Sequence, residues 1–455
     1  MLRAIYRAAW WLIAPAAVLR LWIRSRREHG YREHIGERFG YAAGRLPEDD
    51  APLVWVHAVS VGETRAAQPL VDALLAARPD VRILLTHMTP GGRATGEQLF
   101  GARVLRCYLP YDMPGAVRRF LRTWRPSLGL VMETEVWPTL IDECKRADVP
   151  LVLTNARMSA RSFRRAAKFG AAAKEVFGGF TRVLAQSPAD AERLTALGAR
   201  NVAVLGNVKF DMASPPALIA RGHEWRRAIG ARPVWVAAST REGEEELVLQ
   251  AFAALQVPDA LLILVPRHPQ RFDEVAALVE RKGLTLQRRS RWAPVAGATG
   301  ATGSAAQGGF AAHGSLAGEG GSAADGGGVP ALRAEINVLL GDTMGEMGAY
   351  YAAADLAFIG GSLLPLGGQN LIEACAVGVP VLIGPHVFNF TQATADATAA
   401  GAALQVADPA DLARALRELF LDKARRIAMG AAAAAFAARH RGATARTVDV
   451  LSALI

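Results

Sequence analysis

The strongest constraint on the fold is a regular alternation of short apolar segments with longer amphipathic ones, repeated in two halves of the 455-residue chain. In the first half, apolar runs that predict strands cover 53–57, 81–86, 103–108, 128–132, 150–154, 182–186 and 202–205. Segments with helical periodicity lie between them, at 63–77, 92–99, 114–123, 138–147, 161–176 and 188–197. Apolar strands that alternate with helices predict a parallel sheet covered on both faces.

The second half repeats this pattern after a break at 212–218, where Ser214-Pro215-Pro216 cannot continue a helix. Its predicted strands are 234–238, 260–265, 336–340, 355–359 and 379–383. We therefore predict an α/β protein with two Rossmann-like, doubly wound domains that face a central cleft. Ligands in such folds bind at the carboxyl ends of the strands. The predicted bounds are 1–27 for an N-terminal helix, 28–212 and 218–430 for the two domains, and 431–455 for a C-terminal helix.

One segment of the second half does not fit the alternation. In residues 297–328, twelve of 32 positions are glycine, mixed with alanine and serine. Such a composition cannot bury enough apolar surface to offset the entropy of ordering it. We predict a flexible surface insertion with bounds 291–333, and a functional lid is the alternative.

Basic residues concentrate in two places, and the formal net charge of the chain is +10. Residues 1–40 hold eight arginines against three glutamates, around an apolar run from Ala8 to Val18 that contains two tryptophans. That run is too short to span a bilayer, so we predict a helix that lies on an anionic leaflet; a buried first helix is the alternative. Residues 157–182 hold seven basic residues against one glutamate, which favours contact with phosphate or anionic lipid over a plain solvated helix face.

Several classes of protein are disfavoured by what the sequence lacks. The three cysteines share no short spacing, so neither a disulfide framework nor a zinc finger is expected. No His-x-x-x-His or Asp-x-Asp pair occurs, which argues against a metal in the active site. Nucleic-acid binding is disfavoured as well, because no aromatic platform or recognition helix accompanies the basic residues.

Polar residues follow the predicted strands of the first half. Ser60 and Gly62 open the helix after strand 53–57, and Glu133 and Glu135 follow strand 128–132. Free N–H groups at such a helix start can bind an anion or a sugar, although a tight turn alone would also explain them. One of the two acids could serve as a helix cap instead. Glu37 lies between two glycines in a basic loop, where a surface pair with arginine is the simplest interpretation.

The second half carries more such residues. They are Ser239-Thr240, Pro266-Arg267-His268-Pro269, Gly341 to Met347, Gly360-Gly361-Ser362, and Asn370 with Glu373. Each group follows a predicted strand, so we expect them to converge on one site, where backbone and hydroxyl donors and Arg267 bind phosphate and Glu373 binds ribose. The sequence has neither a Walker lysine nor a Gly-x-Gly-x-x-Gly motif, so neither an ATPase nor a dehydrogenase is supported.

An ordered set of motifs covers nearly the whole chain. It consists of GERFGY, HAVSVGET, LPYDMP, METEVWP, NARMSARS, GNVKFD, STREGEE, LVPRHPQRF, GDTMGEM and GGSLLPLGGQNLIEACAVGVPVLIGPH. This set resembles the bacterial 3-deoxy-D-manno-octulosonic acid (Kdo) transferases, lipid A-modifying enzymes of the GT-B glycosyltransferase class. The glycine-rich insertion departs from the family because it looks longer than usual.

The resemblance implies a reaction and a place in the cell. Kdo is transferred with inversion from CMP-Kdo, bound mainly by the second domain, to lipid IVA, bound by the first, and CMP is released. This is a step of lipopolysaccharide core biosynthesis that needs no metal or cofactor. The implied partners are the donor, the acceptor and anionic inner-membrane lipids, without nucleic acid, at the cytoplasmic face of the inner membrane.

The resemblance also implies roles for residues of this sequence. Glu37 would be the general base, and Glu133 or Glu135 a second essential acid. The implied substrate-binding residues are Ser60, Gly62, Lys209, Ser239, Thr240, Arg267, His268, Met344, Gly345, Glu346, Asn370 and Glu373. Two alternatives are another GT-B enzyme acting on a different anionic membrane acceptor, and a non-catalytic protein that binds a membrane surface.

Overall fold

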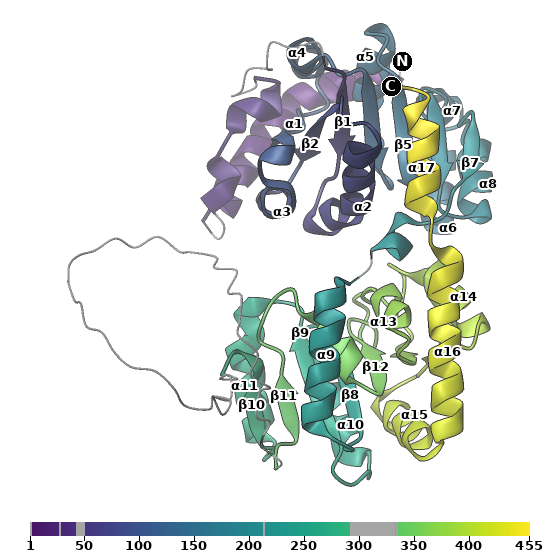
Figure 1. Ribbon diagram of the computed structural model, residues 1–455. Coiled ribbons are helices and arrows are strands. Elements are labelled where there is room, and N and C mark those ends of the chain that lie inside the picture. Colours follow the sequence, from purple (N-terminus) through teal and green to yellow (C-terminus); the bar gives the residue numbers. More distant parts are fainter. Residues whose placement is uncertain (1, 27–28, 42–50, 213, 292–332, 334) are drawn as a thin grey trace, which may run out of the picture. The chain divides into compact units, whose positions relative to one another are not determined.

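The computed structural model describes residues 2–26, 29–41, 51–212, 214–291, 333 and 335–455. The glycine-rich segment 297–328 lies outside the described residues. The chain divides into two compact units, the first formed by Met1–Met212 with Ala438–Ile455 and the second by Ala213–Ala437 (Figure 1). Each unit is built around its own sheet.

The first unit contains a parallel sheet of seven described strands in the order β3-β2-β1-β4-β5-β6-β7. The strands are β1 (Leu53–His57), β2 (Arg82–His87), β3 (Leu105–Tyr108), β4 (Leu128–Met132), β5 (Leu151–Ala156), β6 (Arg182–Ala185) and β7 (Val202–Val204). Trp55 in β1 pairs with Leu84 on one side and Gly129 on the other. The predicted parallel sheet is confirmed, with its strands displaced by at most two residues.

Side chains of this sheet enter two apolar clusters because successive residues of a strand point to opposite faces. In β1, Leu53 and Trp55 enter one cluster, and Val54 and Val56 enter the other. All five residues of the strand are buried. Gly129 of the neighbouring strand is required by this packing, since a Cβ there would lie 2.9 Å from the Trp55 ring.

Helices cover both faces of the first sheet, and Figure 1 shows α2 and α17 side by side on one of them. They are α2 (Val61–Ala77), α3 (Pro90–Phe100), α4 (Pro114–Trp124), α5 (Pro138–Arg146), α6 (Ala160–Ala167), α7 (Ala171–Phe177), α8 (Pro188–Ala196) and α17 (Ala443–Ser452). The prediction of one helix over 161–176 is wrong. The helix is interrupted before α7, where Gly170 takes a φ of 50° that glycine adopts without steric cost.

The second unit contains a parallel sheet in the order β10-β11-β9-β8-β12-β13-β14. Its strands are β8 (Val234–Thr240), β9 (Leu261–Pro266), β10 (Leu286–Arg288), β11 (Val338–Leu340), β12 (Leu356–Ile359), β13 (Val381–Ile383) and β14 (Ala403–Gln405). The sequence did not predict β10 and β14. Both are three-residue edge strands, too short to show an apolar run.

The helices of the second unit are α9 (Pro216–Ile229), α10 (Glu244–Ala254), α11 (Phe272–Arg281), α12 (Met347–Ala353), α13 (Ile372–Val377), α14 (Thr391–Ala399), α15 (Pro409–Leu421) and α16 (Lys423–His440). The prediction of a single C-terminal helix over 431–455 is wrong. Gly442, with a φ of 87°, separates α16 from α17. Asp211 then fixes α17 to the first unit, because its carboxylate accepts the N–H groups of Gly442 and Thr444 at 2.6 Å each.

The N-terminal helix α1 (Leu2–Arg24) precedes two short 3-10 turns, η1 (His29–Arg32) and η2 (Ile35–Phe39). On one side Trp10 is buried and stacks on Tyr111, with ring centroids 5.7 Å apart. On the other side Trp11 and Leu12 are 73% and 82% exposed. The alternative of a buried first helix therefore holds for one face of α1. Contact of the exposed face with an anionic leaflet stays a prediction. Within the described residues, no helix is both long and apolar enough to cross a bilayer.

Two histidines are fully buried at the carboxyl edge of the first sheet. His57 ends β1 and His87 ends β2. Nδ1 of His57 lies 2.9 Å from the Thr86 hydroxyl, and Nδ1 of His87 lies 3.0 Å from the carbonyl oxygen of Ala58. Burial lowers the pKa of His57 to about 3 and that of His87 to about 4. Both imidazoles are therefore neutral in the folded protein near pH 7.

These histidines should make stability depend on pH. Their pKa values are lower in the folded than in the unfolded chain, so the unfolded chain binds more protons below about pH 6.5. Each histidine should lower the free energy of unfolding by up to about 1.4 kcal/mol per pH unit as pH falls from about 6.5 toward 4. Urea unfolding at pH 7, 6 and 5 measures this. His87→Gln should flatten the dependence; equal slopes in the variant and the wild type would contradict the assignment.

Candidate active site

Three acids and one lysine lie at the carboxyl edge of the first sheet. Glu133 and Glu135 follow β4, and Glu63 lies in the first turn of α2, after the neighbouring strand β1. Lys209, in the 3-10 turn η4 (Val208–Asp211), places its Nζ 2.7 Å from Oε1 of Glu133. Glu133 has a left-handed φ of 59°, which is uncommon for a residue with a side chain. Glu63 accepts the N–H of Val59 at 2.7 Å.

The environment of this cluster favours a bound proton. Burial raises the pKa of Glu63 to about 8, to which the charges of Glu133 and Glu135 contribute and which Lys209 opposes. Burial also raises the pKa of Glu135, with Glu133 adding to the effect. Near pH 7, Glu63 is therefore mostly protonated, and the cluster can exchange a proton. Sequence reasoning did not select Glu63, although it directly follows Gly62 in the motif HAVSVGET.

The start of α2 forms one border of this cluster. Ser60 is the N-cap residue of α2, but its side chain makes no capping hydrogen bond. Gly62 is exposed, and the nearest atom to a Cβ placed there would be the Ser60 hydroxyl oxygen, 3.9 Å away. Both predicted residues thus lie in an open helix start near Glu63.

Glu37 lies elsewhere along the same edge, at the end of β3. It is 5% exposed, and its Oε2 accepts Nη1 of Arg93 at 2.6 Å and the N–H of Tyr108 at 2.8 Å. Its Oε1 is 3.6 Å from Nδ1 of His34. Two strands separate β3 from β4, which corresponds to about 14 Å across the sheet. The structure therefore does not bring Glu37 into contact with Glu133.

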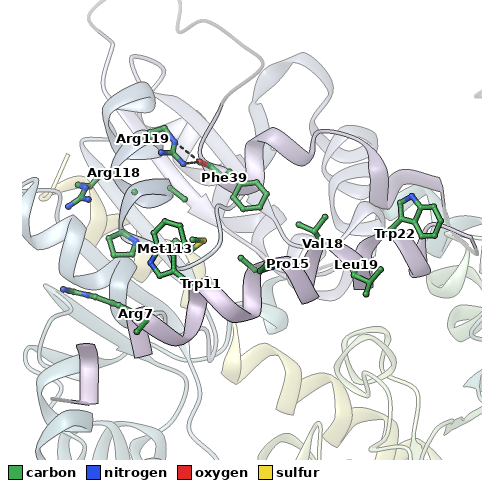
Figure 2. Close-up of a pocket in the computed structure, with 15 residues that line it drawn as sticks. Arg7, Trp11, Pro15, Val18, Leu19, Trp22, Phe39, Met113, Arg118 and Arg119 are labelled. Carbon is green, nitrogen blue, oxygen red and sulfur yellow. Dashed lines mark hydrogen bonds between the residues drawn. The ribbon is translucent and has the colours of Figure 1, made fainter. Parts of the chain in front are cut away.

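An apolar groove lies between α1 and the start of α4, with a volume of about 1130 Å³. Figure 2 shows Trp11, Pro15, Val18, Leu19 and Trp22 of α1 along it. The remaining apolar lining comes from Ala8, Ala14, Phe39, Met113, Pro114 and Ala116. Exposed apolar side chains that form a large contiguous patch are unusual on a soluble protein and mark a binding surface.

Arginines stand at the border of this groove. Arg119 donates to the carbonyl oxygen of Phe39 at 2.9 and 2.6 Å, and Arg7 pairs with Asp142 at 2.7 Å. The Arg118 side chain is 57% exposed, and its Nη1 lies 3.9 Å from Oε1 of Glu143. A second hollow of about 500 Å³ adjoins Arg7, where Asp142, Lys145 and Arg146 complete its lining. The apolar surface is thus bordered by positive charge.

In the second unit, the predicted nucleotide-binding residues follow four strands that are adjacent in the sheet order β11-β9-β8-β12. Ser239, which has a φ of 59°, and Thr240 end β8. Arg267 and His268 follow β9, where the N–H of Arg267 donates to the carbonyl oxygen of Thr240 at 2.9 Å.

The other predicted nucleotide-binding residues follow β11 and β12. Met344, 54% exposed, and Gly345, with a φ of 82°, follow β11. Asn370 lies beyond β12 and donates from Nδ2 to Glu373 at 2.9 Å. All of these groups lie at one edge of the second sheet.

Two of these residues use their polar groups inside the protein. Thr240 is fully buried and its hydroxyl donates to Glu245 at 2.9 Å. Glu346 pairs with Arg221 at 3.1 Å and with Arg289 at 2.8 Å. The substrate-binding roles predicted for Thr240 and Glu346 stay predictions, and both side chains already have partners within the protein.

The expectation that the loop Gly360-Gly361-Ser362 offers its donors to phosphate is wrong. The N–H groups of Gly361 and Ser362 bond to the carboxylate of Glu244, and the Ser362 hydroxyl donates to the carbonyl oxygen of Ile359. Sequence reasoning missed Glu244 because its partners lie far along the chain. Among the described residues, no group of three or more potential ligands could hold a metal ion.

Comparison with known proteins adds independent information. Residues 33–212 match the family model described as 3-deoxy-D-manno-octulosonic-acid transferase (kdotransferase), and residues 331–436 match glycosyl transferases group 1. The chain is 47% identical to a 3-deoxy-D-manno-octulosonic acid transferase of Bordetella pertussis, over 99% of this chain and 98% of that protein. It is 33% identical to a transferase of the same name from Haemophilus influenzae, with the same coverage.

One solved structure has a fold similar to that of this chain. The UDP-GlcNAc 2-epimerase of Neisseria meningitidis, bound to UDP-GlcNAc, matches with a TM-score of 0.55 and 12% identity, over 88% of this chain and 99% of that one. At this identity the match concerns the fold alone, and it agrees with the two parallel sheets described above. The full-length identity to the two transferases is what decides the family: the chain belongs to the 3-deoxy-D-manno-octulosonic acid (Kdo) transferases, enzymes of the GT-B glycosyltransferase class.

Proposed function

We propose that this enzyme transfers Kdo from CMP-Kdo to lipid IVA with inversion of the anomeric centre and releases CMP. Family membership supports the transfer itself. The apolar groove with its arginine border is the observation that supports a lipid acceptor. A water-soluble sugar acceptor would not need an apolar groove. The reaction as proposed uses no metal and no cofactor.

The donor is proposed to bind at the edge of the second sheet. Arg241, Arg267 and Arg271 lie close enough to His268 to help burial lower its pKa, so positive charge surrounds this imidazole. Such charge stabilises the phosphate of the departing CMP. Asn370 and Glu373 are proposed to bind the ribose hydroxyls, and the backbone around Met344 and Gly345 completes the site.

The acceptor is proposed to bind the first unit. One of its acyl chains fits the groove between α1 and α4, and a phosphate group fits the exposed guanidinium of Arg118 at the groove border. Helix α6 adds further positive charge from Arg161, Arg164 and Arg165, which are all exposed. The exposed aromatic side of α1 would lie on the cytoplasmic leaflet of the inner membrane, where anionic lipids attract the basic residues.

Proton transfer completes the proposed mechanism. A sugar hydroxyl of the acceptor attacks the anomeric carbon of Kdo, and a base takes its proton during the attack. Glu37 is proposed to be that base, and the cluster of Glu133, Glu135 and Lys209 is proposed to stabilise charge on the transferred sugar. Ser60 and Gly62 would bind the acceptor or the sugar through free groups at the start of α2.

Filling the groove should weaken binding of the acylated acceptor selectively. Val18→Trp places an indole in the groove where an acyl chain of the acceptor is proposed to lie. Excluding two or three methylene groups, at about 0.8 kcal/mol each, should raise the KM for lipid IVA about 15- to 60-fold. Leu12→Trp is the matched control, because Leu12 is exposed on α1 and does not line the groove. Initial rates of CMP release and mass spectrometry of the lipid product measure the effect.

A deacylated acceptor tests whether Val18→Trp acts through acyl-chain binding or through the transfer reaction itself. On that acceptor, Val18→Trp and the wild type should have the same KM. An unchanged KM of Val18→Trp for lipid IVA would exclude the groove as the acyl site. If the wild-type enzyme forms no Kdo-lipid from CMP-Kdo and lipid IVA, the proposed donor and acceptor are themselves wrong.

A further inference from the structure

A buried carboxylate in the second unit is surrounded by backbone N–H groups. Glu244, the first residue of α10, is fully buried. Its Oε1 accepts the N–H groups of Ser362 at 2.9 Å and Leu363 at 3.0 Å. Its Oε2 accepts those of Gly361 at 2.5 Å and Arg241 at 3.2 Å. One side chain therefore satisfies four backbone donors from two loops.

The loop that follows β12 has the conformation of an anion-binding site. Gly361 takes a φ of 69°, and successive N–H groups in such a turn point into one concavity that binds anions. Here the anion is the protein's own carboxylate. The loop also lies tightly against the end of β8, because a Cβ on Gly360 would be 2.7 Å from the carbonyl oxygen of Ser239.

Glu244 thereby joins the two groups of residues that are proposed to bind the nucleotide. We call Arg267 and His268 the phosphate arm, and Asn370 and Glu373 the ribose arm. Glu244 bonds Arg241, which follows Thr240, and the carbonyl oxygen of Thr240 accepts the N–H of Arg267 at 2.9 Å.

On the other side, the carbonyl oxygen of Gly361 accepts the N–H of Gly368 at 2.7 Å, two residues before Asn370. Each arm is thus connected to the Glu244 carboxylate through two hydrogen bonds and a short stretch of chain.

We propose that Glu244 is a positioning residue for the nucleotide sugar, which sets the spacing between the phosphate arm and the ribose arm. The proposal rests on the proposed donor site. A carboxylate suits this role because both of its oxygens only accept hydrogen bonds, which matches four convergent donors. An apolar residue would leave these N–H groups buried and unsatisfied.

Glu244→Gln tests the proposal with little change in volume. Its amide oxygen still accepts two N–H groups, but its NH₂ group faces the other two donors and must push one loop away. A displacement of about 1 Å at a reacting group can cost about 10²-fold in rate, so we expect kcat/KM for CMP-Kdo to fall by about that factor. When CMP binds to the variant, the displaced loop must return, and this costs about as much as one hydrogen bond to a charged group. That cost corresponds to a rise of about 10-fold or more in the Kd for CMP.

Asp355→Asn is the matched control within the same unit. The Asp355 carboxylate accepts the N–H of Val234 at 2.9 Å and Nη2 of Arg226 at 3.1 Å. It lies at the start of β8 and β12, opposite to the edge where Glu244 acts. Both variants should lower the free energy of unfolding, but only Glu244→Gln should raise the Kd for CMP, measured by titration calorimetry on the folded protein. The KM for the lipid acceptor should stay unchanged in both.

Glu244→Asp keeps the negative charge but is one methylene shorter, so it should retain more CMP affinity than Glu244→Gln and less than the wild type. A wild-type Kd for CMP in folded Glu244→Gln, or an equal loss in Asp355→Asn, would overturn the positioning role. If Glu244→Gln does not fold, Glu244→Asp decides, and an unchanged Kd and kcat/KM would overturn the proposal. If the wild-type enzyme does not bind CMP, the donor site is wrong and the proposal falls with it.

Discussion

Glu37→Gln should lower the rate of Kdo transfer by about 10²- to 10⁴-fold, the usual contribution of a general base. Glutamine keeps the shape of the side chain but cannot take the proton of the attacking hydroxyl. In the structure, Oε2 of Glu37 is held by Arg93 and by the N–H of Tyr108. Oε1, 3.6 Å from Nδ1 of His34, is therefore the oxygen that we expect to receive the proton.

The same substitution also removes a buried ion pair, so a structural effect must be separated from a catalytic one. Asp355→Asn is the matched control. The Asp355 carboxylate pairs with Arg226 at 3.1 Å, a contact that touches none of the residues in the proposed machinery. Both variants should lose stability in urea unfolding, but only Glu37→Gln should lose turnover at saturating substrates. Near-normal turnover in a folded Glu37→Gln enzyme would exclude Glu37 as the base.

The sheets could be predicted because most of their strands are continuous apolar runs buried on both faces. β4, over Leu128–Met132, was predicted at its observed bounds. The strands β10 and β14 could not be predicted, since Leu-Gln-Arg and Ala-Leu-Gln show neither an apolar run nor an alternation. Their place in the sheet depends on neighbours distant in the sequence.

Helix ends were harder to predict than strands, although the sequence carried a usable signal. Gly170 and Gly442 lie inside the segments that were predicted as single helices, and both have positive φ values. A glycine within a helical pattern costs only about 1 kcal/mol, so periodicity outweighed it in the prediction. The chain instead uses each glycine to turn.

The gathering of the candidate residues at one sheet edge could be predicted from topology, but the pairing among them could not. Residues after parallel strands must gather at one edge, and Glu133 indeed follows β4 and Arg267 follows β9. The sequence does not indicate which neighbour forms a hydrogen bond or an ion pair with each polar group. Arg93 pairs with Glu37, and Glu244 takes the donors of the loop after β12, through contacts that only the folded chain creates.

Replacing Glu133 should lower kcat/KM by about 10²- to 10³-fold, as expected for a fixed charge at a reaction centre. Glycosyl transfer develops positive charge on the transferred sugar, and a fixed carboxylate stabilises it. Glu133 is suited to this role because Lys209 holds it at 2.7 Å and its backbone has a left-handed φ. Glu133→Gln should therefore lose more activity than Glu135→Gln, which lacks that ion pair among the described contacts.

The pH dependence of the rate provides a sharper test, because Glu133 and Lys209 act on Glu63 in opposite directions. The negative charge of Glu133 raises the pKa of Glu63, which lies at about 8, and the positive charge of Lys209 lowers it. An ionisation near pH 8 in the pH–rate profile should therefore move to lower pH in Glu133→Gln and to higher pH in Lys209→Met. Lys174→Met, at an exposed position of α7, is the control and should leave it unchanged.

The double variant of Glu133→Gln and Lys209→Met distinguishes the effect of these charges on stability from their effect on activity. Lys209→Met alone removes the cation that pairs with Glu133, and breaking such a pair costs up to about 3–5 kcal/mol when it is fully buried. Adding Glu133→Gln removes the negative charge of that pair, so the double variant should recover part of the lost stability but none of the lost activity. If both single variants shift the ionisation in the same direction, or if the double variant regains turnover, then Glu133 and Lys209 do not act on the reaction through their charges.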